Sequence, residues 1–156
     1  MDILDEEVLR LWQCLDENEV KYIMIGGFAT NLHGFQRTTG DLDLWIKDSL
    51  ENRKKLRECF KKIGLGDFES IETIELIPGW TTLHFDSGFE LDIMTSIKGF
   101  NQAKFDECYN IAPTAIIHNI PVKFLHLNQL IEAKKASGRP KDLLDVIELE
   151  KIRDGK

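Results

Sequence analysis

Two aspartates separated by one residue, Asp41 and Asp43, stand within the otherwise apolar stretch DLDLWI. If this stretch is a β-strand, side chains two residues apart point the same way, so the two carboxylates lie about 6–7 Å apart on one face. Such a pair can bind a hard cation such as Mg²⁺, which takes one or two carboxylates and fills its remaining positions with water and phosphate oxygens. The pair alone is a weak signal, because a chain with 27 acidic residues contains such spacings by chance. A solvent-facing strand edge is the simpler alternative.

A pair of adjacent glycines, Gly26 and Gly27, follows the apolar run KYIMI. Because they lack Cβ atoms, glycines between a strand and a helix let backbone N–H groups approach an anion, and the following helix N-terminus adds its positive dipole end. A tight structural turn between two elements is the alternative. Gly26 and Gly27 are therefore candidates for binding a triphosphate.

A third carboxylate, Asp92, lies in a second alternating stretch, FELDIM, in which every second residue is apolar. An ionised aspartate in a central strand needs a partner, and two further aspartates are suitable partners only if cations lie between them. Three carboxylates around two metal ions suit phosphoryl or nucleotidyl transfer, in which one ion activates the attacking hydroxyl and the other stabilises the leaving pyrophosphate. This interpretation predicts that Asp41, Asp43 and Asp92 bind Mg²⁺ or Mn²⁺, with Asp92 also the candidate base.

The elements that must position these residues mix helices and strands. We expect helices at 6–18, 28–33, 128–137 and 140–152. A further helix is expected to begin at a capping box formed by Asp48 and Glu51 and to end at about residue 62. Strands are expected at 21–25, 41–46, 71–77, 80–85 and 89–94, followed by a late pair of short strands in TAIIH and VKFLH. Because consecutive strands are joined by tight turns, the predicted class is α/β (α+β), with a short mixed β-sheet, helices mainly on one face and C-terminal helices.

Length and composition restrict the class of protein. The 156 residues fit a single domain, 1–156, and the apolar fraction of 42% and charged fraction of 30% are those of a globular protein. Three cysteines far apart, with no Cys-x-x-Cys pair, argue against a disulfide framework or zinc site and favour a reducing cytoplasm. No secretory leader or membrane span is expected from the sequence, and the net charge of −7 argues against an extended nucleic-acid-binding surface.

The stretch GGFATNLHGFQRTTGDLDLWI resembles the opening signature of the DNA polymerase β-type nucleotidyltransferase superfamily: a glycine pair, a short helix, then Asp-x-Asp on the next strand. Within it, HGFQRTTGDLDL is similar to small bacterial nucleotidyltransferases related to the AbiEii toxins and to antibiotic nucleotidyltransferases. FELDIM matches the later strand with the third carboxylate, and EAKKASGRPKDLLDVIEL resembles the C-terminal helices of the same relatives. The sequence departs from the pattern at Phe28, where the family often has serine.

This resemblance implies the nucleotidyltransferase fold and a magnesium-dependent enzyme that transfers a nucleoside monophosphate from an NTP to an acceptor hydroxyl. It implies Gly26 and Gly27 at the triphosphate, Asp41 and Asp43 as metal ligands, and Asp92 as the third acid. The acceptor is open: a small molecule, an RNA end or a hydroxyl of a protein. The alternative function is a nucleotide- or protein-binding module of the same fold without turnover, such as one half of a toxin–antitoxin pair. A protein partner or a homodimer could complete the site, because the chain leaves little room for an acceptor-binding domain.

Three basic residues are weaker candidates for phosphate binding. Arg37 precedes the DLDLWI strand, whereas Lys134 and Arg139 flank the break between the last two helices and could close over a triphosphate. A solvated arginine, and basic residues that favour the dipole of a helix end, explain them equally well.

Three ring-bearing residues have both a functional and a structural interpretation. His33, near a helix end, is expected to cap or pack rather than to catalyse. Trp45 and Trp80 could stack on a base, but packing in the core or at its rim explains both equally well.

Overall fold

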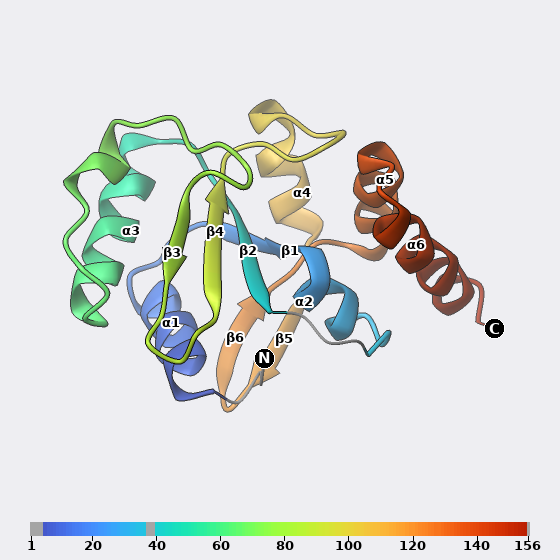
Figure 1. Ribbon diagram of the computed structural model, residues 1–156, viewed down its shortest axis with the longest axis horizontal. Coiled ribbons are helices and arrows are strands. Elements are labelled where there is room, and N and C mark those ends of the chain that lie inside the picture. Colours follow the sequence, from blue (N-terminus) through green and yellow to red (C-terminus); the bar gives the residue numbers. More distant parts are fainter. Residues whose placement is uncertain (1–4, 37–39, 156) are drawn as a thin grey trace.

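The main sheet of the protein has four strands and is mixed, as predicted. The structure, a computed structural model, describes residues 5–36 and 40–155. The strand order is β1-β2-β4-β3, in which β2 runs antiparallel to β1 and parallel to β4, and β3 runs antiparallel to β4 (Figure 1). The strands are β1 (Tyr22–Ile25), β2 (Asp41–Ile46), β3 (Thr82–His84) and β4 (Glu90–Met94).

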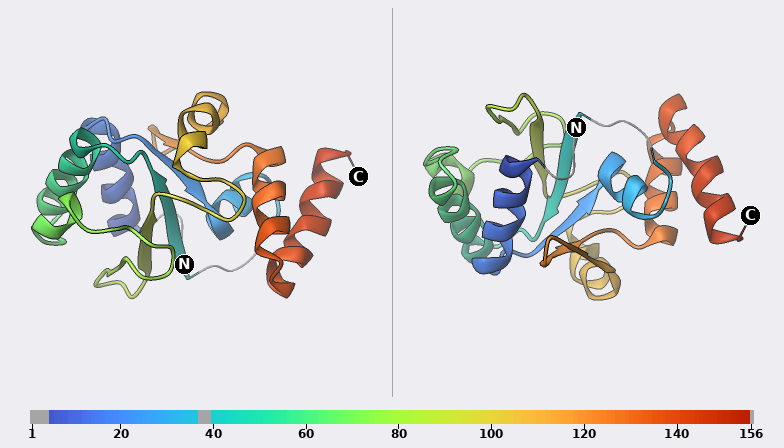
Figure 2. Two further views of the ribbon diagram at one scale, coloured as in Figure 1. Left: turned by 90° about the horizontal axis from the view of Figure 1, so that it is seen from above. Right: turned by 90° about the horizontal axis from the view of Figure 1, so that it is seen from below.

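Helices lie around this sheet and extend beyond one end of it. They are α1 (Glu6–Glu17), α2 (Gly26–Leu32), α3 (Leu50–Lys62), α4 (Phe105–Ile111), α5 (Leu127–Ser137) and α6 (Pro140–Arg153), with the 3-10 turns η1 (Glu69–Glu72) and η2 (Gln102–Lys104). The predicted late strands form the hairpin β5 (Thr114–Ile117) and β6 (Ile120–Lys123). The α5–α6 pair stands at one end of the molecule, and α1 and α3 lie at the other (Figure 1 and Figure 2). Within the described ranges, no helix combines the length and the apolar character that a membrane crossing requires.

The first helix, α1, forms because its apolar residues recur at helical spacing. Val8, Leu11, Trp12 and Leu15 are fully buried, so they line one face that packs into the core. The side chain of Asp5 caps the helix by accepting a hydrogen bond from the Glu7 N–H at 2.9 Å.

The helix α3 has a different cap from the one predicted. Ser49, rather than Asp48 with Glu51, accepts the N–H of Asn52 at 3.1 Å, so the predicted capping box is wrong. The carboxylate of Asp48 instead accepts a hydrogen bond from the Arg53 guanidinium at 2.8 Å. Asp48 therefore forms an ion pair with Arg53 and does not cap the helix.

The two faces of β2 have different surroundings. Leu42 and Leu44 are fully buried on one face. On the other face Trp45 is also fully buried, with its ring 5.2 Å from that of Phe105 in α4 and its Nε1 donating to the Thr95 carbonyl at 2.8 Å. Packing, not base stacking, therefore accounts for Trp45. Towards the start of the strand the same face is less buried and carries Asp43 and Asp41.

The segment 71–77, predicted as a strand, is not one. It begins in η1 and continues without regular structure, and β3 is shorter than the predicted strand 80–85. The largely buried Arg53 explains the difference, because its Nη1 donates to the carbonyls of Ile71 at 3.0 Å and Ile74 at 2.5 Å. These carbonyls bind a side chain from α3 instead of a neighbouring strand.

Candidate active site

Pairing between parallel strands brings the carboxylates of two sequence-distant stretches together. In the register of β2 and β4, Asp43 lies directly opposite Asp92, and adjacent strands are separated by about 4.8 Å. Asp41 lies two residues earlier on β2 and therefore on the same face as Asp43. Within residues 5–36 and 40–155, however, no group of three or more His, Cys, Asp or Glu side chains is close enough to hold a metal ion by itself. The structure thus assembles the acidic patch but not a complete metal cage.

The electrostatics of Asp43 reflect this crowding. Burial is the main cause that raises the pKa of Asp43 to about 7, and the neighbouring charges of Asp92 and Asp41 raise it further. Arg139 and Lys134 act in the opposite direction. An ionised Asp43 is therefore costly, and a cation beside it would remove the cost.

One oxygen of the Asp92 carboxylate accepts a backbone hydrogen bond. Its Oδ2 accepts the Gly79 N–H at 2.7 Å, whereas its Oδ1 is buried and, among the described residues, has no hydrogen-bond partner. Burial raises the pKa of Asp92, and hydrogen bonds from the Gly79 N–H and from the side chain of Thr82, its neighbour on β3, oppose this effect. Unpaired buried oxygens are uncommon in proteins. Oδ1 is therefore an atom that a proton or a cation could satisfy.

The glycine pair stands inside a helix rather than in a turn before it. The helix α2 begins at Gly26, two residues earlier than predicted, and directly follows β1. Gly26 has a positive φ of 68°, and a Cβ at this position would overlap the carboxylate of Asp43. Glycine is therefore required at residue 26 partly to leave room for Asp43. Gly27 is buried, and so is Phe28, which packs edge-on against Trp12.

Replacing Gly26 by alanine is expected to cost about 1–3 kcal/mol of unfolding free energy, because the new Cβ is strained at positive φ and also displaces the Asp43 carboxylate. Gly64→Ala is the matched control, since Gly64 has a similar φ of 79° but open space around a Cβ. Urea denaturation of both variants measures the difference. Equal losses in the two variants would show that only backbone strain, and not contact with Asp43, requires the glycine.

A cluster of basic and acidic side chains connects α5 with α6. Lys134 is buried, and its Nζ lies 2.9 Å from Asp145 and 3.4 Å from Asp142. Arg139 is largely exposed, and its Nε donates to Asp142 at 2.7 Å. Ser137 also donates to Asp142. Burial alone would raise the pKa of Asp142, but these hydrogen bonds and charges outweigh it and hold that pKa below its usual range.

One cavity of about 790 Å³ unites the acidic and basic groups. Its lining includes every predicted site residue that the structure describes: Gly26, Gly27, Asp41, Asp43, Asp92, Lys134 and Arg139. The remaining predicted residue, Arg37, lies outside the described residues. Its lining comes from the strands and turns around β2 and β4 and from the α5–α6 pair, and it combines acidic with basic side chains.

Several lining residues were not predicted from the sequence. Pro78, Gly79, Lys98 and Lys141 also line the cavity, as does an apolar group formed by Met94, Ile97, Leu125, Leu130 and Ala133. The Pro-Gly dipeptide signals a turn in the sequence, but nothing local indicates that this turn meets Asp92.

Of the two remaining ring-bearing candidates, His33 has a structural role and Trp80 has none that the structure shows. His33 Nε2 hydrogen-bonds the Leu125 carbonyl at 2.6 Å, and its ring packs edge-on against Phe124. The prediction of a packing histidine is therefore confirmed. Trp80 is 82% exposed, and nothing in the structure explains its exposure.

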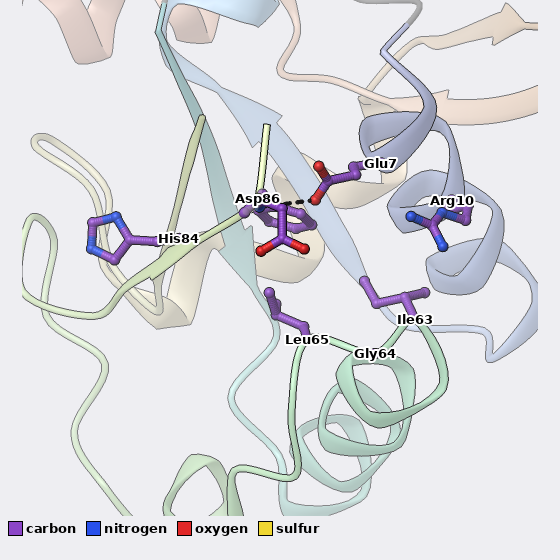
Figure 3. A pocket seen from close by; sticks show the side chains of 8 residues that line it. Glu7, Arg10, Ile63, Gly64, Leu65, His84 and Asp86 are labelled. Carbon is purple, nitrogen blue, oxygen red and sulfur yellow. Dashed lines mark hydrogen bonds between the residues drawn. The ribbon is translucent and has the colours of Figure 1, made fainter. Parts of the chain in front are cut away.

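A second, smaller cavity of about 120 Å³ contains none of the predicted site residues (Figure 3). At its edge the Glu7 carboxylate accepts the backbone N–H groups of Asp86 and Ser87, at 3.2 and 2.7 Å. This contact attaches the β3–β4 turn to α1, which is a structural role.

The sequence matches no model of a known protein family and no curated protein. Solved structures, in contrast, are similar over nearly the whole chain. The lincosamide antibiotic adenylyltransferase LnuA, in its lincomycin-bound structure, aligns with 97% of this chain and 99% of its own, with a TM-score of 0.62 and 14% identity. A candidate nucleotidyltransferase from Thermotoga maritima aligns with 96% and 91%, with a TM-score of 0.61 and 14% identity.

A third structure extends this similarity to a fungal protein. An antigenic nucleotidyltransferase-like protein from Paracoccidioides brasiliensis aligns with 92% of this chain and 72% of its own, with a TM-score of 0.53 and 21% identity. The order of the elements and the mixed sheet are consistent with this structural similarity. The fold of this chain is therefore the nucleotidyltransferase fold.

Proposed function

We propose that the protein is a magnesium-dependent nucleotidyltransferase that transfers a nucleoside monophosphate from an NTP to an acceptor hydroxyl. The observation that supports this most is the single cavity that brings three aspartates together with Lys134 and Arg139. A metal–triphosphate complex carries both signs of charge and matches this mixed lining. The fold similarity to an antibiotic adenylyltransferase agrees with this class of reaction.

The residues present fit Mg²⁺, although they do not form a complete cage. Mg²⁺ usually takes only one or two carboxylates and completes its octahedron with water and substrate phosphates, so three converging ligands are not required in the free protein. Asp41, Asp43 and Asp92 would hold it, and the unpaired buried Oδ1 of Asp92 is the observation that favours a cation here. When bound, the ion would supply charge neutralisation at the phosphates and polarisation of their oxygens.

Residues of the chain would bind the triphosphate and accept the proton of the acceptor. Lys134, Arg139 and the backbone at Gly26 and Gly27 bind and orient the triphosphate. The Asp92 carboxylate accepts the proton of the acceptor hydroxyl as the new bond from that oxygen to the α-phosphorus forms. The bond from the α-phosphorus to the bridging oxygen breaks, and pyrophosphate leaves with the electron pair.

A second candidate function is a nucleotide- or protein-binding module without turnover, such as one half of a toxin–antitoxin pair. A row of exposed apolar side chains on α6, formed by Leu143, Leu144 and Ile147, favours a protein partner for this helix or a second copy of the chain. Such a partner is compatible with either function.

Incubation with each α-labelled NTP and Mg²⁺ or Mn²⁺, alone and with cell extract, tests the proposal. We expect label to appear on an acceptor only with the metal, and to disappear with Asp43→Asn. Tight metal-dependent NTP binding without any labelled product would favour the binding module. Strong ATP binding in EDTA, equal to that with Mg²⁺, would contradict the proposed metal site.

A further inference from the structure

A β-turn next to the third carboxylate, Asp92, contains a glycine in a conformation that other residues rarely adopt. The turn spans Ile77 to Trp80 and is closed by a hydrogen bond from the Trp80 N–H to the Ile77 carbonyl at 3.0 Å. Pro78 occupies its second position and Gly79, with a φ of 80°, its third. Proline followed by a residue at positive φ is the pattern of a type II turn. A Cβ on Gly79 would meet no atom within 4 Å, so the backbone conformation alone requires glycine here.

The type II conformation decides where the N–H of Gly79 points. Type I and type II turns differ mainly in the orientation of the peptide between their second and third residues, which faces opposite sides in the two types. The N–H of that peptide belongs to Gly79, and here it donates to Asp92 Oδ2 at 2.7 Å. A type I turn would direct it away from the carboxylate.

The hydrogen bond to Oδ2 restricts the rotation of the Asp92 carboxylate on β4. The side chain of Thr82, on the adjacent strand β3, also hydrogen-bonds this carboxylate and acts with the turn. Oδ1 then stays buried without a partner among the described residues, on the strand position that lies opposite Asp43. Both Gly79 and Asp92 line the large cavity.

We propose that Gly79 is a positioning residue, whose N–H fixes the rotation of the Asp92 carboxylate so that one oxygen remains available to a divalent cation beside Asp43. This inference rests on the proposed function, because it concerns the same metal site. It adds a residue whose contribution comes from the backbone and which acts only through Asp92.

Three substitutions separate positioning from general strain. Gly79→Ala disfavours the positive φ and shifts the turn towards type I, whereas Gly79→Asn keeps the positive φ more readily, because asparagine tolerates this conformation. Gly88→Ala is the matched control: Gly88 has a φ of 96° in the β3–β4 turn, with open space around a Cβ, but does not line the large cavity.

The test is a titration of the metal-free 156-residue protein with Mn²⁺, with and without ATP, in which electron paramagnetic resonance measures free Mn²⁺. We expect Gly79→Ala to weaken Mn²⁺ binding by about 10–100-fold, the range typical for losing a group that orients a metal ligand. Gly79→Asn should be intermediate, and Gly88→Ala should stay close to wild type. Thermal melting of each variant verifies that it is folded.

The outcomes distinguish this inference from the proposed function. If Asp92→Asn abolishes Mn²⁺ binding but Gly79→Ala behaves like Gly88→Ala, the positioning role is wrong and the metal site stands. If wild type and Asp92→Asn bind Mn²⁺ equally weakly, both the proposed function and this inference are overturned. Equal losses in Gly79→Asn and Gly79→Ala would also contradict the inference, because the turn type would then not matter.

Discussion

Asp43→Asn is expected to stabilise the metal-free protein and at the same time abolish its magnesium-dependent NTP binding. Burial and the charges of Asp92 and Asp41 make an ionised Asp43 costly, and asparagine keeps the shape of the side chain without its charge. We expect the free energy of unfolding at pH 8 to rise by about 1 kcal/mol or more. The same substitution removes a proposed metal ligand, so the gain in melting temperature from Mg²⁺–ATP should be lost.

The pH dependence of stability provides a second readout of Asp43. Between its ordinary pKa of 3.8 and the raised value of about 7, the folded protein holds a proton that the unfolded chain has released. The stability contributed by this group is therefore fully present below the lower value and is lost as the pH rises through the higher one. Asp43→Asn should remove this dependence from the metal-free protein, measured by urea denaturation across this pH range.

Asp67→Asn is the matched control, since the same change should have the opposite effect on stability. The Arg57 guanidinium binds Asp67 at 2.6 Å and, through this hydrogen bond, holds the pKa of its carboxyl below the usual range. Its loss should lower stability and leave the effect of Mg²⁺–ATP intact. An Asp43→Asn variant that melts lower without metal, yet gains as much from Mg²⁺–ATP as wild type, would refute the metal site.

Asp145→Asn is expected to destabilise the protein by about 3 kcal/mol, near the lower end of the range for breaking a buried ion pair. Lys134 is buried, and Asp145 at 2.9 Å is its nearer acidic partner. Once Asp145 is neutral, Asp142, at 3.4 Å and already bound to Arg139, is the one remaining ion-pair partner of the lysine among the described residues. Chemical denaturation measures the loss, and weaker NTP binding should accompany it if Lys134 binds phosphate.

A matched control lies on the same helix. Glu148 and Lys151 form an exposed pair at 3.3 Å, so Glu148→Gln should change stability by less than about 1 kcal/mol. The double variant Lys134→Met with Asp145→Leu should recover most of the stability, because replacing a buried pair by apolar side chains is often nearly neutral. A double variant as unstable as Asp145→Asn would show that lost packing, not an uncompensated charge, causes the effect.

The sequence alone determined which residues share a face and where several elements begin and end. The alternation in DLDLWI and FELDIM identified both strands and placed Asp41 with Asp43 on one face of β2. Gly138, in a left-handed conformation after α5, and Pro140, in the first turn of α6, end one helix and begin the next as expected. These features follow from local periodicity and backbone preferences, which a short window of residues already contains.

Only the tertiary structure decided how these elements meet. Three features join residues that are far apart in the chain or on different elements. They are the register that sets Asp43 opposite Asp92, the contact that requires glycine at residue 26, and the buried pair of Lys134 with Asp145. Likewise, the predicted strand 71–77 does not form, because Arg53 of α3 donates hydrogen bonds to two of its carbonyls. Periodicity tells which way a side chain points, but strand order and register depend on the packing of the whole core, because a shift of one residue in register reverses the face of every side chain.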